Sequence, residues 1–165
     1  LDRSSAASDV YKRQLVRSEH PINPESQKIH GIDATMLRGA PSQAESWQRF
    51  QVFAGDNLLL GHNVAFDLRF LQIAAVKHGL AQPPQALDTL LLSSVVYPER
   101  EQHRLEDIAQ RLGIAVLGRH TSLGDALLTA EVFCRLIPLL EHKGIHTLGQ
   151  ALAASRESWY ARLDY

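Results

Sequence analysis

Apolar positions recur along this chain with two different periods, and each period predicts a kind of element. Apolar residues at three- and four-residue spacings predict a long, largely buried helix over 63–78. A second long helix is expected from Ser122, with Pro138 kinking it or ending it. Shorter helices are expected over 34–37 after an N-cap at Asp33, and over 44–54, 89–96, 105–112 and 147–155.

Short apolar runs predict the strands. Residues 58–60 are all leucine and are expected to form a buried strand, and a second short strand is expected over 86–89, running into the next helix. Residues 15–17 are interpreted as the tail of another strand, which is stopped by Pro21 because proline has no N–H for a ladder. Strands that alternate with helices predict an α/β layered domain.

The composition is that of a globular protein. The chain has 165 residues, of which 45% are hydrophobic and 21% are charged, so it can bury a core of its own. Its 17 Lys and Arg residues against 18 Asp and Glu residues give a formal net charge of −1. This balance excludes a polybasic nucleic-acid coat, so any nucleic-acid contact is expected to be local.

Signals for targeting and redox chemistry are scarce. The single cysteine, Cys134, cannot form an internal disulfide, and the chain has no Cys-x-x-Cys pair for zinc or redox chemistry. No apolar run approaches the roughly 18 residues of a membrane span, and the first residues lack the apolar stretch of a signal peptide. We therefore expect a soluble, cytoplasmic protein with no membrane contact.

Residues 1–14 differ from the rest because they are small, polar or charged and show no helical or strand period. They resemble the translation of adapter or vector sequence, so we interpret them as a non-native leader. A disordered native arm is the alternative.

Two segments combine an acidic residue with the start of a helix. Residues 61–71 run from an apolar strand into a helix whose first turn carries Asp67, and in 119–130 His120 precedes a helix with Asp125 in its first turn. Strand ends and helix N-termini meet at one edge of an α/β sheet, which is the usual ligand site. Two carboxylates there repel one another and need a cation, for which Mg²⁺ or Mn²⁺ is suited. A histidine beside them can act as a general base.

Each of these residues alone has an ordinary structural explanation. Aspartate is favoured in the first turn of any helix by the exposed N–H groups and the macrodipole. Ser122 and Asp125 also resemble a capping box, with aspartate in place of glutamate. Only the two segments taken together indicate catalytic chemistry.

The same segments resemble sequence motifs of the DnaQ-like 3′→5′ exonucleases, histidine subtype of the DEDD superfamily, which includes the proofreading epsilon subunit of DNA polymerase III. The second family motif is matched by Asn63, Val64, Ala65, Phe66 and Asp67, with Phe70 and Leu71. The third is matched by His120, Asp125, Ala126 and Thr129. Two shorter family elements are matched by Ile29, His30, Gly31 and Ile32 and by Asp88 and Thr89.

The resemblance implies an RNase H-like fold, a mixed sheet flanked by helices, and a phosphodiester hydrolase. Asp67 and Asp125 would be catalytic metal ligands, and His120 would be the base that activates the attacking water. Two Mg²⁺ or Mn²⁺ ions in the intact protein would stabilise the attacking and leaving oxygens. The enzyme would release nucleoside 5′-monophosphates from a single-stranded 3′ end, of DNA rather than RNA, in proofreading or repair.

Substrate contacts are also implied for Asn63, Phe66 and His30. For Phe66, and for Phe70 one turn later, packing in an apolar core is the favoured alternative to stacking on a base. For Asn63, helix capping explains the residue as well as substrate binding does.

The first motif of the family, Asp-x-Glu on the first strand, has no counterpart before Leu15. We therefore expect an exonuclease domain over 15–142 whose first strands are missing, followed over 143–165 by a C-terminal helix and tail. The tail either leads to another domain of the parent protein or docks on a partner such as a polymerase, and its sequence does not decide between the two. A sheet without its central strand leaves backbone groups unpaired. With part of the carboxylate set also absent, this chain is expected to be inactive and poorly stable by itself.

Two other functions stay open on the sequence alone. A non-catalytic nucleic-acid-binding or scaffold module of the same fold would explain the missing motif, although it gives no reason for His120 and both aspartates to occur together. A small-molecule enzyme would need another site, and the chain has no glycine-rich phosphate loop.

Overall fold

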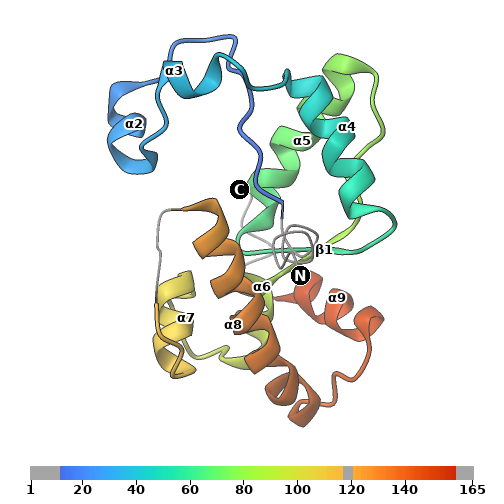
Figure 1. Ribbon diagram of the computed structural model, residues 1–165. Coiled ribbons are helices and arrows are strands. Elements are labelled where there is room, and N and C mark those ends of the chain that lie inside the picture. The colour runs from blue at the N-terminus through green and yellow to red at the C-terminus, as the bar shows by residue number, and fades with distance from the viewer. Residues whose placement is uncertain (1–11, 117–120, 159–165) are drawn as a thin grey trace, which may run out of the picture. The chain divides into compact units, whose positions relative to one another are not determined.

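The computed structural model describes residues 12–116 and 121–158 (Figure 1). The chain divides into two compact units. The first unit consists of Leu1–Asp56 and Leu71–Gln82, and the second of Asn57–Phe70 and Pro83–Tyr165. Each unit is described by itself below. Helix α5, Val64–His78, contributes its first part to the second unit and its remainder to the first.

The first unit is helical in its described part. Besides the end of α5 it contains α2 Pro24–His30, α3 Ala34–Leu37 and α4 Gln43–Ala54. Helices α3 and α4 confirm the expected elements. Asp33 caps α3 by accepting from the Met36 N–H at 2.9 Å, and Ser42 forms a capping box with Glu45 at the start of α4.

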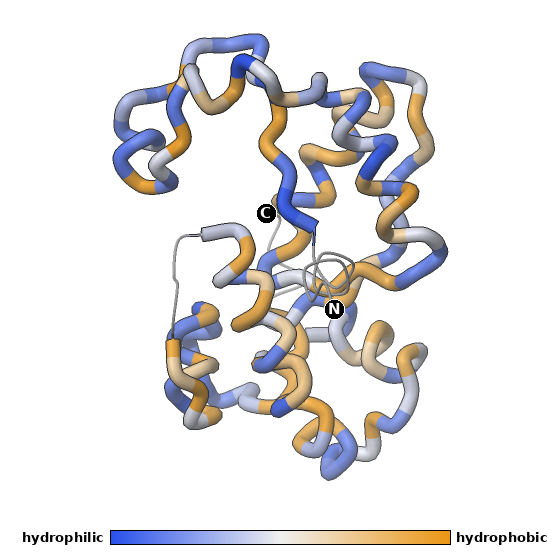
Figure 2. The backbone as a smooth tube through the Cα atoms, in the orientation of Figure 1, coloured by the Kyte–Doolittle hydropathy of each residue, from blue (hydrophilic) through white to orange (hydrophobic). Residues whose placement is uncertain are grey.

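Helix α2 was not expected from the sequence. Asn23 and Pro24 look like a stop signal, yet proline is well suited to the first position of a helix, where its missing N–H costs nothing. The Asn23 side chain caps the helix by accepting from the Glu25 N–H at 2.8 Å, and Gly31 ends it with a left-handed φ of 69°. Figure 2 shows that this part of the chain is mostly hydrophilic.

The strand expected over 15–17 was wrong, because the structure gives residues 12–18 no regular secondary structure. The Arg17 N–H donates to the Pro41 carbonyl oxygen at 2.8 Å. Proline has no N–H to donate in return, so this contact cannot grow into a ladder.

Trp47 is the main buried side chain of the first unit, with 3% of its surface exposed. Its indole N–H donates to the Ala81 carbonyl oxygen at 3.1 Å, and the Gln51 amide donates to the same oxygen at 3.2 Å. Both bonds tie α4 to the segment that follows α5. Among the described residues of this unit, the other buried apolar residues are Ala54 of α4 and Ala74 and Ala75 of α5.

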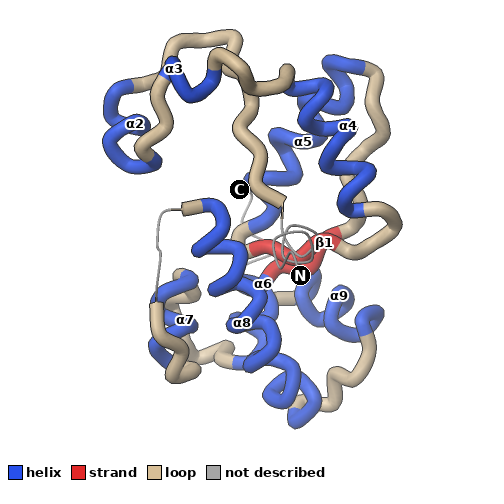
Figure 3. Tube along the Cα trace, viewed as in Figure 1, coloured by secondary structure: helices blue, strands red, loops and turns tan. Residues whose placement is uncertain are grey.

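The second unit contains a small parallel sheet, shown in red in Figure 3. Strand β1 is Leu59–Gly61 and strand β2 is Ala86–Asp88, with Leu60 opposite Leu87 and Gly61 opposite Asp88. Both strands were expected from the sequence. Of the mixed sheet that the resemblance implied, the described residues contain this parallel pair.

Besides the start of α5, the described part of the second unit contains four further helices. They are α6 Thr89–Val96, α7 Leu105–Arg111, α8 Ser122–His142 and α9 Leu148–Glu157. Helix α6 packs against α8 and α9, and α7 packs against α8 (Figure 1). None of the described helices is both long and apolar enough to cross a lipid bilayer.

The core of the second unit lies among these helices. Its most deeply buried apolar side chains are Leu92 of α6, Ile108 of α7, and Val132 and Leu136 of α8, none with measurable exposure. Burying a side chain of this size contributes about 1.5–3 kcal/mol. This core also keeps α8 continuous past Pro138, because Leu136 and Leu140 on either side are buried. Of the two alternatives expected for Pro138, kinking the helix or ending it, the second was wrong, because α8 continues to His142.

Helix α5 is not the largely buried helix that its sequence predicts. Only Ala74 and Ala75 are buried, whereas Phe66 is 63% exposed and Phe70 is 57% exposed. The two phenylalanine rings pack edge to face, with their centroids 4.9 Å apart. An apolar periodicity shows that a helix has an apolar side, but it does not say what covers that side.

Candidate active site

A cleft of about 1000 Å³ lies in the second unit, at the end of strand β1. One part of its lining comes from the turn between β1 and α5, with Asn63 and Asp67. A second part comes from the start of α8, with Asp125 and Thr129. Residues 101–106, which include the start of α7, form a third part, and Leu60 of β1 and Leu90 of α6 also line the cleft. The cleft is therefore built at a strand end and at helix N-termini, as expected for an α/β fold.

The turn between β1 and α5 is unusually tight. A Cβ atom on Gly61 would lie 2.6 Å from the Cγ2 atom of Val64, so a larger residue does not fit there. Asn63 adopts a left-handed φ of 55°, which asparagine tolerates better than most residues. These two features turn the chain sharply from the strand into α5 and bring Asp67 into the first turn of the helix at the cleft.

Hydrogen bonds from the end of β2 hold this turn. The Asp88 carboxylate, 7% exposed, accepts from the backbone N–H groups of Asn63 and Val64, each at 2.9 Å. The Thr89 hydroxyl donates to the Gly61 carbonyl oxygen at 3.2 Å. Burial raises the pKa of Asp88, and its backbone hydrogen bonds act in the opposite direction.

The two candidate metal ligands differ in their surroundings. Asp67 as a whole residue is exposed to solvent. Its carboxyl group is nevertheless partly shielded from water, which raises the pKa of that group. Asp125 is half-buried and lies in the first turn of α8.

The N-cap of α8 is Thr121, whose hydroxyl oxygen accepts from the Gly124 N–H at 3.1 Å. The capping box suggested for Ser122 and Asp125 was therefore wrong.

The donor chemistry at the cleft suits a hard divalent cation, since Asp67 and Asp125 both offer carboxylate oxygens. Across the described part of the chain, however, no three Asp, Glu, His or Cys residues form a group that could hold a metal ion. The described residues thus provide a partial ligand set.

The other candidate residues lie in different parts of the chain. Asn63 lines the cleft with Asp67 and Asp125. Phe66 is exposed and is not part of the lining, so the expectation that it packs in a core was wrong. His30 ends α2 in the first unit, where its Nδ1 atom accepts from the Ile32 N–H at 3.0 Å. His120 lies outside the described residues.

His103 lines the cleft, although no functional role was predicted for it from the sequence. It is 3% exposed, its Nδ1 atom lies 2.9 Å from the Ser93 hydroxyl oxygen, and its Nε2 atom lies 3.2 Å from the Arg100 carbonyl oxygen. Burial lowers the pKa of His103. The residue stands in a polar stretch that resembles an ordinary surface loop, so its burial depends on tertiary contacts that no local pattern reveals.

Comparison with known proteins identifies the family. The sequence profile of the exonuclease family (RNase_T) matches residues 5–133. The chain belongs to this exonuclease family. The DnaQ-like resemblance drawn from the motifs is confirmed by this family match and by the relatives described next.

Several relatives carry polymerase names. The chain is 41% identical over 145 residues to a DNA polymerase III subunit epsilon-like protein of Rhodobacter capsulatus, an alignment that covers 87% of this chain and 21% of that protein. It is 35% identical over 130 residues to DNA polymerase III subunit epsilon of Aquifex aeolicus, covering 78% of this chain and 64% of that one. A DNA polymerase III PolC-type of Caldanaerobacter subterraneus is 33% identical over 136 residues, an alignment that covers 82% of this chain and 10% of that protein. The chain thus spans between a tenth and two thirds of these relatives.

A solved structure confirms the fold. Exonuclease X, determined in complex with 5′-overhanging duplex DNA, matches with a TM-score of 0.63 and 22% sequence identity, over 86% of this chain and 78% of that chain. The RNase H-like α/β fold expected from the sequence is therefore correct.

Proposed function

We propose that this exonuclease-family chain is part of a metal-dependent 3′→5′ exonuclease that releases nucleoside 5′-monophosphates. The observation that carries the proposal is the placement of Asp67 and Asp125. They come from two helices far apart in sequence, and both line the cleft at the end of β1. Acidic residues lining one cleft at helix N-termini suit cation-assisted cleavage of a phosphodiester.

In this proposal Asp67 and Asp125 hold the cation. A bound Mg²⁺ or Mn²⁺ would neutralise charge on the phosphodiester and make a water more acidic. Asp67 is the more accessible carboxylate, and Asp125 is fixed by the capped first turn of α8. His120 immediately precedes the Thr121 cap, so we assign it as the base that removes a proton from the attacking water.

The substrate is proposed to be a single-stranded 3′ end, of DNA rather than RNA. The polymerase III names of the relatives and the DNA bound to exonuclease X favour DNA. Asn63 lies in the cleft, where its side chain can contact the terminal nucleotide. The exposed ring of Phe66 can stack on a base, and His30 is assigned a substrate contact on its motif alone.

A partner or further domain of the protein is also proposed. Because the chain covers only part of the length of its polymerase relatives, we propose that a polymerase or a further domain accompanies the nuclease, with proofreading or repair in the cytoplasm as its role.

We further propose that this chain alone does not hydrolyse DNA. No Asp-x-Glu precedes Leu15, and the described residues offer a partial ligand set. The same observation favours the second candidate function, a non-catalytic nucleic-acid-binding or scaffold module of this fold.

The test compares this chain with a protein extended by the segment that its gene encodes before Leu15. Both are assayed on a 5′-labelled single strand with Mn²⁺ or with EDTA, and Asp125→Asn and the exposed Glu131→Gln are made in the extended protein. We expect stepwise shortening from the 3′ end by the extended protein only. This activity should be lost with EDTA and in Asp125→Asn, and kept in Glu131→Gln. An extended protein that carries Asp-x-Glu and binds the strand without shortening it would favour the scaffold module.

A further inference from the structure

The strongest polar cluster in the second unit is formed by Asp88 around the turn from β1 to α5. Its Oδ1 atom accepts from the N–H groups of Asn63 and Leu90, and its Oδ2 atom accepts from the N–H of Val64, each at 2.9 Å. The carboxylate is almost completely buried. A single side chain thus binds the start of its own helix, α6, and the start of α5.

Thr89 extends this cluster to the two residues that precede Asn63. It is fully buried, its hydroxyl donates to the Gly61 carbonyl oxygen at 3.2 Å, and its oxygen lies 3.0 Å from Nδ1 of His62. A hydroxyl that donates to Gly61 can still accept from an imidazole N–H, so both contacts are compatible when His62 Nδ1 carries the proton. Asp88 and Thr89 together therefore contact each residue of 61–64.

The turn needs such contacts for a physical reason. The N–H groups of Asn63 and Val64 lie where α5 starts, so no preceding helical turn provides their acceptors. Asn63 is also held at a positive φ, a conformation that costs free energy unless its surroundings fix it. A buried carboxylate with two free oxygens satisfies both N–H groups through charge-assisted bonds.

The strand register explains why these two residues can do this. Gly61 at the end of β1 is paired with Asp88 at the end of β2, so the residues that follow Gly61 pass directly beside the Asp88 side chain. Asp67 follows Val64 within the first turn of α5. Any change in the turn therefore changes where the Asp67 carboxylate lies in the cleft.

We propose that Asp88 and Thr89 are positioning residues that hold the 61–64 turn and thereby fix the place of Asp67. The inference rests on the proposed function, because Asp67 matters there as a metal ligand. A simpler role, capping α6 through Leu90, would not require the contacts to Asn63, Val64 and Gly61.

The test uses the 165-residue chain labelled with ¹⁵N and ¹³C. In Asp88→Asn one acceptor oxygen is replaced by an NH₂ group, so at least one backbone N–H loses its partner. We expect the Asn63 or Val64 amide to exchange on the order of ten-fold faster. We also expect the Asp67 carboxyl carbon resonance to shift.

Two controls separate positioning from simple destabilisation. Asp33→Asn makes the same change at the N-cap of α3 and should leave the resonances of Asn63, Val64 and Asp67 unchanged. Val132→Ala lowers the stability of the second-unit core without touching the turn, and it should also leave the Asp67 resonance in place.

Thr89 provides an independent pair of variants if Asp88→Asn does not fold. Thr89→Val removes the hydroxyl at nearly constant shape and should shift the Gly61, His62 and Asp67 resonances. Thr89→Ser keeps the hydroxyl and should restore them. The proposal is overturned if Asp67 keeps its wild-type resonance in Thr89→Val, or if Thr89→Ser shifts it as much as Thr89→Val does.

Adding Mn²⁺ to the extended protein, for which the full ligand set is proposed, tests the proposed function separately. Paramagnetic broadening at Asp67 and Asp125 supports their role as metal ligands. Its absence would remove that role, while the shifts in Asp88→Asn and Thr89→Val would still decide whether the two residues hold the turn.

Discussion

The two units of this chain are stabilised in different ways. In the second unit the helices α6, α7 and α8 share an apolar core, with Leu92, Ile108 and Leu136 completely buried. Among the described residues of the first unit, Trp47 is the single large apolar side chain that is buried, and the other buried apolar residues are alanines. The candidate active site lies within the unit that has the larger core, where packing can hold catalytic side chains in place.

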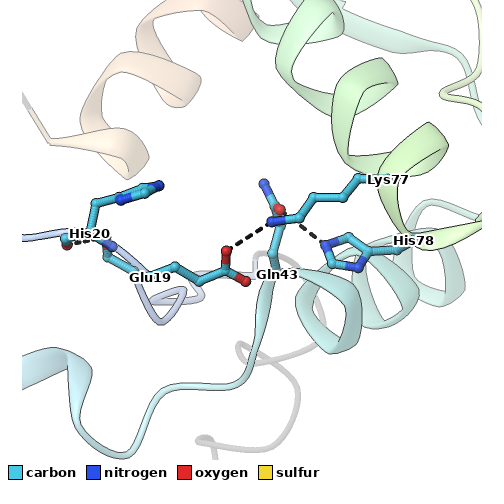
Figure 4. Close-up of polar contacts among 6 residues, drawn as sticks. Glu19, His20, Gln43, Lys77 and His78 are labelled. Carbon is cyan, nitrogen blue, oxygen red and sulfur yellow. Dashed lines mark hydrogen bonds and ion pairs between the residues drawn. The ribbon is translucent and has the colours of Figure 1, made fainter.

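Polar contacts join helix α5 to earlier segments of the first unit. Figure 4 shows the Lys77 ammonium facing the Glu19 carboxylate at 2.8 Å, and His78 3.2 Å from the Gln43 amide oxygen. The Lys77 charge and hydrogen bond hold the pKa of Glu19 below its usual value. Because exposed ion pairs contribute little to stability, we expect the first unit to open more readily than the second.

The largest expected effect comes from the core of the second unit. Leu136→Ala removes a fully buried side chain from α8 and should lower the free energy of unfolding by about 2–5 kcal/mol. Urea denaturation followed by circular dichroism measures it. On the same helix Leu127 is 61% exposed, so Leu127→Ala should stay within about 0.5 kcal/mol of wild type. Equal effects from both variants would show that this core is not packed as described.

A smaller effect is expected from Trp47 in the first unit. Trp47→Phe keeps an aromatic ring but removes the hydrogen bond to Ala81, and should cost about 0.5–1.5 kcal/mol. Hydrogen exchange should become faster for the amides of α4 and stay unchanged for those of α6 and α8. Val52→Ala, at an 86% exposed position of α4, is the matched control. Faster exchange throughout both units would contradict the difference between them.

His103 predicts a pH dependence in the second unit. Burial, aided by Arg111, lowers the pKa of His103, so the unfolded chain binds its proton more readily than the folded one. Stability should therefore decrease as the pH falls below about 6.5, the ordinary value for histidine. Urea midpoints between neutral and mildly acidic pH should show a smaller decrease in His103→Gln than in wild type. The exposed His146→Gln is the control, and the same profile in both variants would count against His103 as the cause.

The smallest effect is expected at the exposed pair of the first unit. Glu19→Gln should leave the urea midpoint within experimental error, because water and salt compensate for the lost charge. A large decrease would mean that this ion pair contributes far more than an exposed pair should.

Most elements could be predicted from local sequence signals. The strand over 58–60, the capped helix after Asp33 and the long helix from Ser122 all have patterns that depend only on neighbouring residues. Helix α2 was missed because Asn23 and Pro24 serve equally well as a stop and as a start. The burial of α5 was overestimated because burial depends on neighbours that are distant in sequence.

The sequence by itself determined the family, the α/β fold, and the candidates Asp67, His120 and Asp125, since motif spacing reflects the chemistry that the residues perform. The tertiary structure decided that Asp67 and Asp125 line one cleft and that Asp88 and Thr89 hold the turn before Asp67. These contacts depend on the register that pairs Gly61 with Asp88 across the sheet. No local pattern encodes that register, because it is set by the packing of strands and helices that lie far apart along the chain.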